Sequence, residues 1–161
     1  MSPASYAAKL RAPFATIGIR TEGGAVSRVV YLPRVEHAQA PTDEIAEKAV
    51  RELQQYLRDP EFTFTVPLVT GGTEFQQRVW KTLSAIPPGE SRTYGEVARM
   101  IRSAPRAVGQ ACGANRIALI IPCHRVVGSQ GALGGFMNRG DGDPVAVKRW
   151  LLTHEGYRFG A

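Results

Sequence analysis

The part of the chain before residue 70 contains runs in which apolar and polar residues alternate, as they do in β-strands. Two such runs, 14–19 and 26–32, flank the turn-forming sequence Thr21-Glu-Gly-Gly, which predicts a β-hairpin. A third alternating run covers 62–66 and ends at Pro67, because proline cannot donate to a β-ladder. This pattern predicts a hairpin and one further strand.

Between the hairpin and the further strand, apolar residues recur at the spacing of an α-helix. They extend from Ile45 to Leu57, and Thr42 is the expected N-cap, with two acidic residues in the first turn. A hairpin, a helix and a strand form a small α+β module. No cluster of polar side chains in it suggests chemistry, so we expect it to act as a scaffold.

The remainder of the chain is predicted to be mainly helical. Helices are expected to start at Thr73, where Gln76 completes a capping box, at Thr93 and at Arg106, and a last helix covers 145–155. The two short middle helices are joined by a brief polar turn. This is the pattern of a helix-turn-helix.

Two predicted domains of an α+β fold, 1–71 and 72–161, meet at a pair of glycines, and the second domain resembles a winged-helix-like DNA-binding domain. The net charge of +6 belongs entirely to the second domain, because the first carries eight of the 20 basic and eight of the 14 acidic residues. Localised positive charge is typical of surfaces that bind polyanions. The alternative is that the chain is mildly basic for solubility alone.

The second helix of the helix-turn-helix has residues of only modest size, which lets its backbone approach another surface closely. A DNA groove is the natural candidate for that surface, and close packing against protein is the alternative. The residues concerned are Ala107, Gly109, Gln110, Ala111, Gly113 and Ala114.

An apolar run at 117–121 is followed by Pro122, Cys123 and His124. The run predicts a buried strand that ends at the proline and delivers the cysteine and the histidine to the edge of a pocket. For an isolated pair of this kind the alternative is a turn after a core strand, because free cysteine is often buried and inert.

The two cysteines, Cys112 and Cys123, do not suggest a disulfide framework, and neither they nor the three histidines have metal-ligand spacing. We therefore expect no structural metal. No apolar segment approaches the length that would cross a bilayer, so we expect no membrane contact and a cytoplasmic location.

With the sequence Pro122-Cys-His-Arg-Val in view, the chain resembles the O6-alkylguanine-DNA alkyltransferases, also called methylated-DNA–protein-cysteine methyltransferases. The resemblance is strong over 72–161 and loose before it. Further motifs in the family's order and near its spacing are Thr73-x-Phe-Gln-x-x-Val-Trp, Thr93-Tyr94, Arg106-Ala-Val-Gly, Asn115 and Lys148-x-Trp-Leu-Leu-x-His-Glu-Gly.

The resemblance implies a DNA repair enzyme that reverses damage directly. A cysteine thiolate takes the alkyl group from O6-alkylguanine, and O4-alkylthymine is a further expected substrate. Because the thioether product has no easy hydrolytic exit, the resemblance implies a single-turnover methyltransferase that needs no cofactor. It also implies that the partner is double-stranded DNA bound through the minor groove, by a protein that we expect to be a monomer.

The resemblance assigns catalytic roles to individual residues. Cys123 is the nucleophile and alkyl acceptor, and His124 takes its proton through a water, because neighbours on extended backbone point in opposite directions. Glu155 orients His124, although a solvated acid near a helix end is the alternative. Tyr94 donates a proton to the leaving guanine, and Asn115 organises the turn beside the cysteine.

Arg106 matches the family's arginine that fills the space left by the flipped base, and a phosphate contact or a surface charge is the alternative. Phe136 stands where the family usually has tyrosine, and the segment 137–144 is longer than usual. Further DNA contacts are expected at Thr93, Tyr94, Ala107, Gln110, Ala111, Gly113 and Ala114. Pocket residues are expected at Val126, Phe136 and Met137.

Two other functions compete with alkyl transfer. A DNA-binding lesion sensor could use the same scaffold, but relatives of that kind typically lack the cysteine. A Cys-His-Glu hydrolase would turn over an ester or an amide, but it would not explain a basic helix-turn-helix.

Overall fold

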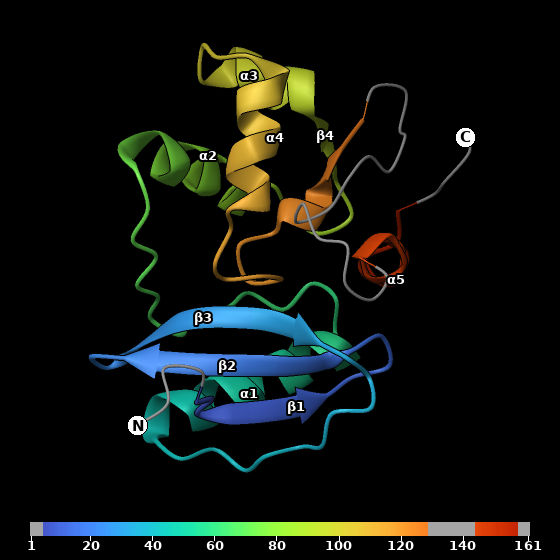
Figure 1. The fold of residues 1–161 in the computed structure, drawn as a ribbon. Helices are drawn as coiled ribbons and strands as arrows, with labels where there is room; N and C mark the ends of the chain where they lie inside the picture. The colour runs from blue at the N-terminus through green and yellow to red at the C-terminus, as the bar shows by residue number, and fades with distance from the viewer. Residues whose placement is uncertain (1–4, 129–143, 158–161) are drawn as a thin grey trace. The chain divides into compact units, whose positions relative to one another are not determined.

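The structure is a computed structural model that describes residues 5–128 and 144–157 of the 161-residue chain. The chain divides into two compact units, one formed by 1–70 with 116–120 and the other by 71–115 with 121–161 (Figure 1). The short segment 116–120 was expected in the second domain. It belongs to the first unit because Val29 donates its N–H to the carbonyl of Arg116 and accepts from the N–H of Ala118.

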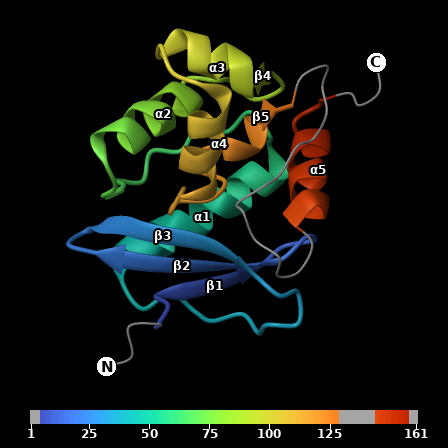
Figure 2. The same cartoon turned by 45° about the horizontal axis from the view of Figure 1, so that its top comes forward.

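The first unit is an antiparallel sheet with one helix along a face of it (Figure 2). The strand order is β1-β2-β3. The predicted hairpin is confirmed, whereas β1 was not predicted, because a four-residue strand is too short to show alternation. The elements are β1 (Ala8–Arg11), β2 (Thr16–Glu22), β3 (Ala25–Leu32) and α1 (Glu44–Arg58).

Two details of the first unit differ from the predictions. The N-cap of α1 is Asp43, whose carboxylate accepts from Ala46 N at 2.8 Å, and not Thr42. The predicted strand at 62–66 does not form. The N–H groups of Thr65 and Val66 donate instead to the Glu52 carboxylate at 2.9 and 3.0 Å, so a side chain replaces the partner strand.

The apolar run at 117–121 does not form a strand either. It makes one isolated bridge, between Ile117 and Val29, and then turns, with Leu119 at a φ of 69°. The run is buried almost throughout, as predicted, but a buried turn and a buried strand have the same composition. Cys123–Arg125 then forms a 3-10 helix, η1.

The second unit is mainly helical, as predicted. The capping boxes at Thr73 with Gln76 and at Thr93 with Glu96 begin two of its helices. A short parallel pairing of β4 with β5, which was not predicted, joins the start of α3 to the segment after η1. The elements are α2 (Glu74–Ser84), β4 (Arg92–Thr93), α3 (Tyr94–Met100), α4 (Pro105–Gly113), η1, β5 (Val126–Val127) and α5 (Pro144–His154).

The predicted helix-turn-helix corresponds to α3 and α4, which pack against each other and against α2 (Figure 1). Trp80 on α2 is buried and donates its indole N–H to the carbonyl of Ala111 on α4 at 2.9 Å. Arg78 on α2 donates to the carbonyl of Ile101 at the end of α3 at 2.7 Å. The two short helices are therefore held by α2. Within the part of the chain that the structure describes, no helix is long and apolar enough to span a bilayer.

Candidate active site

Cys123 lies at the first position of η1, and its side chain is surrounded by polar groups of the second unit although it is only 3% exposed. The Asn115 side-chain amide donates to its sulfur at 3.2 Å and to the carbonyl of Ile121 at 2.9 Å. The thiol itself donates to the carbonyl of Cys112 at 3.6 Å. Asn115 thus joins the end of α4 to the chain immediately before the nucleophile.

The pKa of the Cys123 thiol is raised well above its usual value. Burial is the main cause, and the neighbouring Cys112 side chain adds to it. Asn115 and Lys148 act in the opposite direction, because both favour the thiolate. The resting sulfur is therefore protonated, and a nucleophilic reaction needs a base.

His124 and Glu155 form a buried pair that can supply this base. Nε2 of His124 lies 2.8 Å from Oε2 of Glu155, and neither side chain is more than 1% exposed. Nδ1 of His124 is buried and has no hydrogen-bond partner among residues 5–128 and 144–157. The pair favours the tautomer with the proton on Nε2, which leaves Nδ1 as the acceptor.

Arg125 holds Glu155 from the other side. Its Nε donates to Oε1 at 2.8 Å and one terminal nitrogen donates to Oε2 at 3.0 Å, while the other terminal nitrogen donates to the carbonyl of Ile86 at 2.6 Å. Burial alone would raise the pKa of Glu155, but hydrogen bonds and charge from His124 and Arg125 hold it well below its usual range. Glu155 is therefore ionised, and the alternative of a solvated acid is wrong.

The pKa of His124 is lowered, chiefly by burial and further by the charges of Arg125 and Lys148, although Glu155 acts to raise it. The imidazole is thus neutral near pH 7 and able to accept a proton. Cys123 and His124 share no direct hydrogen bond in the described structure. The prediction of a bridging water was based on extended backbone, and that basis is wrong because both residues lie in η1.

Lys148 is a residue of the site whose role was not predicted. It lies on α5, it is fully buried, and its Nζ is 5.7 Å from the centre of the Tyr94 ring. Burial lowers its pKa from 10.5 to about 8, although the thiols of Cys112 and Cys123 act to raise it. Helical spacing in the sequence could have indicated that Lys148 is buried, because it shares a helix face with the buried Leu151 and Leu152.

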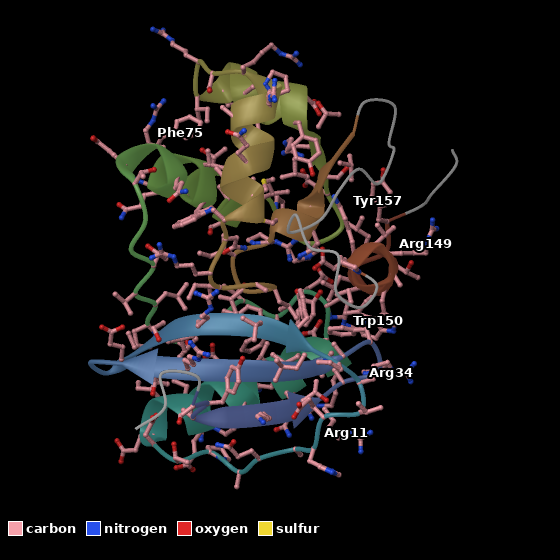
Figure 3. The ribbon with its side chains drawn as sticks, in the orientation of Figure 1. Arg11, Arg34, Phe75, Arg149, Trp150 and Tyr157 are labelled. Atoms are coloured by element: carbon pink, nitrogen blue, oxygen red, sulfur yellow. The ribbon has the colours of Figure 1, made fainter. Side chains whose placement is uncertain are left out.

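The two residues that follow Lys148 on α5 are less buried than Lys148 is. Arg149 is exposed and extends away from α5, and Trp150 is half-buried (Figure 3). The buried ammonium of Lys148 lowers the pKa of Cys123.

Tyr94 begins α3 and is half-buried. Burial raises the pKa of its hydroxyl, and the charges of Cys112 and Cys123 add to the effect, so it remains a protonated phenol. A Cβ atom at Gly109 of α4 would lie 3.9 Å from its ring. The structure therefore brings Tyr94 to the same region as the nucleophile.

The predicted DNA-binding residues of α4 divide by exposure. Arg106 and Gln110 are exposed, whereas Ala107, Gly113 and Ala114 are half-buried. Ala111 is only 2% exposed, so a DNA contact from its side chain is contradicted, because that face of α4 packs on α2.

Two further sets of predicted residues complete the site. Val126 is fully buried beside η1, while Phe136 and Met137 lie outside the described residues. Thr93 caps α3 and is half-buried. Among the residues that the structure describes, no group of three or more His, Cys, Asp or Glu side chains could hold a metal ion.

Comparison with known proteins gives consistent matches. Residues 74–157 match the family model described as 6-O-methylguanine DNA methyltransferase, DNA binding domain. A methylated-DNA–protein-cysteine methyltransferase of Methanosarcina mazei is 37% identical over 91% of this chain and 94% of its own length. The constitutive methylated-DNA–protein-cysteine methyltransferase of Bacillus subtilis is 43% identical over 74% of this chain and 70% of its own.

Solved structures give the same result. The crystal structure of Mycobacterium tuberculosis O6-methylguanine methyltransferase superimposes with a TM-score of 0.78 at 37% identity, over 91% of this chain and 90% of that one. The same organism's protein has been solved in complex with DNA, and that structure superimposes with a TM-score of 0.77 at 38% identity, over 91% and 90%.

Proposed function

We propose that this chain, which belongs to the 6-O-methylguanine DNA methyltransferase family, repairs DNA by transferring the alkyl group of O6-alkylguanine to its own Cys123. The chain is a methylated-DNA–protein-cysteine methyltransferase with an α+β fold.

Proton removal from Cys123 is the first step. His124 accepts the thiol proton at Nδ1 through a bridging water, while Nε2–H donates to Glu155. The observation that carries this proposal is the buried Nδ1, which has no partner in the described chain while Nε2 is 2.8 Å from the Glu155 carboxylate. Arg125 acts as a positioning residue, because its charge keeps Glu155 ionised and His124 neutral.

Two groups favour the thiolate as it forms. The amide of Asn115 donates to the sulfur at 3.2 Å, and the ammonium of Lys148 lowers the pKa of Cys123. Both are buried, so their interactions with the sulfur are weakly screened by water. They offset part of the cost of forming an anion at a buried position.

Alkyl transfer is then a single displacement. A bond forms between the Cys123 sulfur and the alkyl carbon, the bond from that carbon to O6 breaks, and its electron pair goes to the guanine. Tyr94 donates a proton to the guanine and regains one from water; its raised pKa keeps the phenol protonated near pH 7 before the transfer. The thioether cannot be hydrolysed readily, so each molecule reacts once. O4-alkylthymine contains the same type of carbon–oxygen bond and is proposed as a second substrate.

DNA binding is proposed for the exposed surface of α4. Arg106, in the first turn of the helix, is exposed and fills the stack after the damaged base is flipped out. Gln110 lies one turn further along the same exposed surface. That surface projects little from the helix backbone, because it also contains the small, half-buried residues Ala107, Gly113 and Ala114. Such a surface suits the minor groove and contacts that depend little on base sequence. The protein is proposed to bind as a monomer.

The test of the transfer is an intact-mass measurement after incubation with duplex DNA that contains O6-methylguanine. We expect one added methyl group, located on Cys123 and absent from Cys123→Ser. Cys112→Ser is the matched control and should still be methylated. If the folded wild-type protein gains no methyl group, the proposal is wrong. Repeated turnover of an activated ester that depends on Cys123 would favour a hydrolase instead.

The role of Arg106 is tested by comparing two substrates. Arg106→Ala should react with the free base O6-methylguanine as the wild type does, but it should react much more slowly with the duplex. Arg51→Ala, which removes an exposed arginine of α1 in the first unit, is the control and should change neither rate. Equal losses on both substrates would contradict a role in base flipping.

A further inference from the structure

Cys112 is a buried thiol that the proposed reaction does not use. It lies in the last turn of α4 and is 5% exposed. The sulfur of Cys123 is 3.6 Å from its carbonyl oxygen. The neighbouring Cys112 side chain also contributes to the raised pKa of the nucleophile. The second unit therefore holds two free, buried cysteines next to each other, with the Cys123 thiol hydrogen-bonded to the backbone of Cys112.

We propose that Cys112 is a resolving cysteine, which forms a reversible disulfide with Cys123 after the latter is oxidised by a peroxide. The disulfide would remove the nucleophile from use, and a thiol reductant would restore it. The loss of alkyl transfer that accompanies the disulfide rests on the proposed function of Cys123. Formation of the disulfide does not.

The oxidation has two balanced steps. The Cys123 thiolate attacks one oxygen of hydrogen peroxide, the oxygen–oxygen bond breaks, and hydroxide leaves, so that the sulfur becomes a sulfenic acid. The Cys112 sulfur then attacks the sulfenic sulfur, the sulfur–oxygen bond breaks, and the departing hydroxide takes the Cys112 proton. Overall, two thiols and one peroxide give one disulfide and two waters.

The surroundings of the two sulfurs favour this reaction over further oxidation. Burial raises the pKa of Cys123, so the thiolate that reacts with peroxide forms when His124 takes the proton, and Asn115 and Lys148 favour that thiolate. Because the Cys123 sulfur lies 3.6 Å from the carbonyl oxygen of Cys112, a sulfenic acid would form next to the second cysteine without any large movement of the chain. Cys112 lies one residue before the end of α4, where a rotation of its side chain disturbs few helical hydrogen bonds.

The sequence provides a direct way to detect the bond. Trypsin cleaves after Arg106, Arg116 and Arg125, so the two cysteines fall in the separate peptides 107–116 and 117–125. An internal disulfide joins these two peptides within one chain. A disulfide between chains joins the same peptides but gives a dimer on a non-reducing gel.

The experiment is to treat the full chain with hydrogen peroxide, block free thiols with iodoacetamide, and measure the intact mass without reductant. We expect a monomer that has lost two hydrogens and carries no label, with peptides 107–116 and 117–125 joined. Transfer from O6-methylguanine DNA should fall in proportion to the oxidised fraction. It should return on treatment with dithiothreitol.

Cys112→Ser and Cys112→Ala are the matched variants. Two substitutions are used so that the test can still be made if one of them prevents folding. Both should transfer alkyl groups before oxidation, but peroxide should convert Cys123 to sulfinic acid, which dithiothreitol does not reverse. The inference is overturned if wild-type Cys112 remains open to labelling after oxidation and denaturation, or if only dimers form. A disulfide in a protein that never transfers an alkyl group would refute the proposed function and leave this inference standing.

Discussion

Replacement of Lys148 by methionine should alter both the stability and the reactivity of the second unit, in a way that depends on pH. The methionine side chain has a similar length but no charge. Lys148 is fully buried, and burial lowers its pKa from 10.5 to about 8. The folded chain therefore binds this proton less tightly than the unfolded chain does.

The size of the effect follows from that pair of pKa values. A lowering from 10.5 to about 8 means that folding disfavours the charged form by about 3 kcal/mol. This cost is fully present below pH 8. It disappears as the pH rises towards 10.5, because the unfolded chain then loses its proton too. The stability of the wild type, relative to the methionine variant, should thus rise by about 2.5 kcal/mol between pH 7 and pH 10.

The same substitution should slow alkyl transfer. Charged Lys148 lowers the pKa of Cys123, so its loss raises that pKa further and leaves less thiolate at neutral pH. We expect a decrease on the order of tenfold, which corresponds to about 1.4 kcal/mol of lost charge stabilisation. A variant that gains stability at pH 7 while it loses activity would show that the buried charge is retained for function.

The assay is denaturant unfolding at pH 7 and pH 10, followed by tryptophan fluorescence. Both tryptophans, Trp80 and Trp150, belong to the second unit, so the signal reports on the part that contains Lys148. Transfer is measured with the free base so that DNA binding does not contribute. Lys81→Met, at an exposed position of α2, is the control and should change neither quantity by much.

Parallel stability profiles of the two proteins would rule out a lowered pKa for Lys148. If the difference between the wild type and Lys148→Met is the same at pH 7 and pH 10, the lysine is not held with a lowered pKa. An unchanged rate of transfer to Cys123 would show that the charge does not assist the thiolate. Groups that titrate in this range without interacting with Lys148 are common to both proteins, so they cancel in the comparison, whereas the two cysteines that interact with Lys148 do not.

Three further substitutions test the packing of the site. Thr73→Ala removes the capping box of α2 and should lower the free energy of unfolding, measured by urea denaturation, by about 1 kcal/mol. A change near zero would show that the cap does not stabilise the helix. Trp80→Phe leaves the carbonyl of Ala111 without its donor, so we expect the free energy of unfolding to fall by about 1–3 kcal/mol. Because α4 is then less firmly held, DNA binding should also be weaker in a fluorescence titration. Glu155→Gln leaves the Arg125 charge buried without a counterion and should cost about 3–5 kcal/mol at pH 7. Since the pKa of Glu155 is lowered on folding, the stability of the wild type should also fall as the pH drops below 4.5. Thermal melts between pH 3 and pH 7 should show a smaller fall in the glutamine variant.

Local patterns predicted much of the fold because the interactions involved are local. The capping boxes at Thr73 and Thr93 join residues three apart, and the hairpin turn uses adjacent glycines at φ of 57° and 81°. The same reasoning failed for 62–66 and 117–121. In both segments the backbone finds partners that are distant in sequence, a glutamate of α1 in one and a strand edge in the other.

The candidate site shows the same division. The resemblance selected Cys123, His124 and Glu155, and the structure brings the last two within hydrogen-bonding distance although they are 31 residues apart. It also shows that Arg125 belongs to the same network, because two of its nitrogens bind the Glu155 carboxylate. The exposed position of Arg106 is consistent with its predicted role, which stays a prediction.

The sequence by itself determined which chemical groups are present and where the local elements begin, because motifs and caps depend on near neighbours. Only the tertiary structure decided the states of those groups: a neutral histidine, an ionised glutamate, a buried lysine with a lowered pKa, and two buried cysteines next to each other. Protonation depends on burial and on charges brought together from distant parts of the chain. Lys148 and Cys112 could therefore be read in the sequence as helix residues, but their influence on Cys123 appears only when α4, η1 and α5 are packed together.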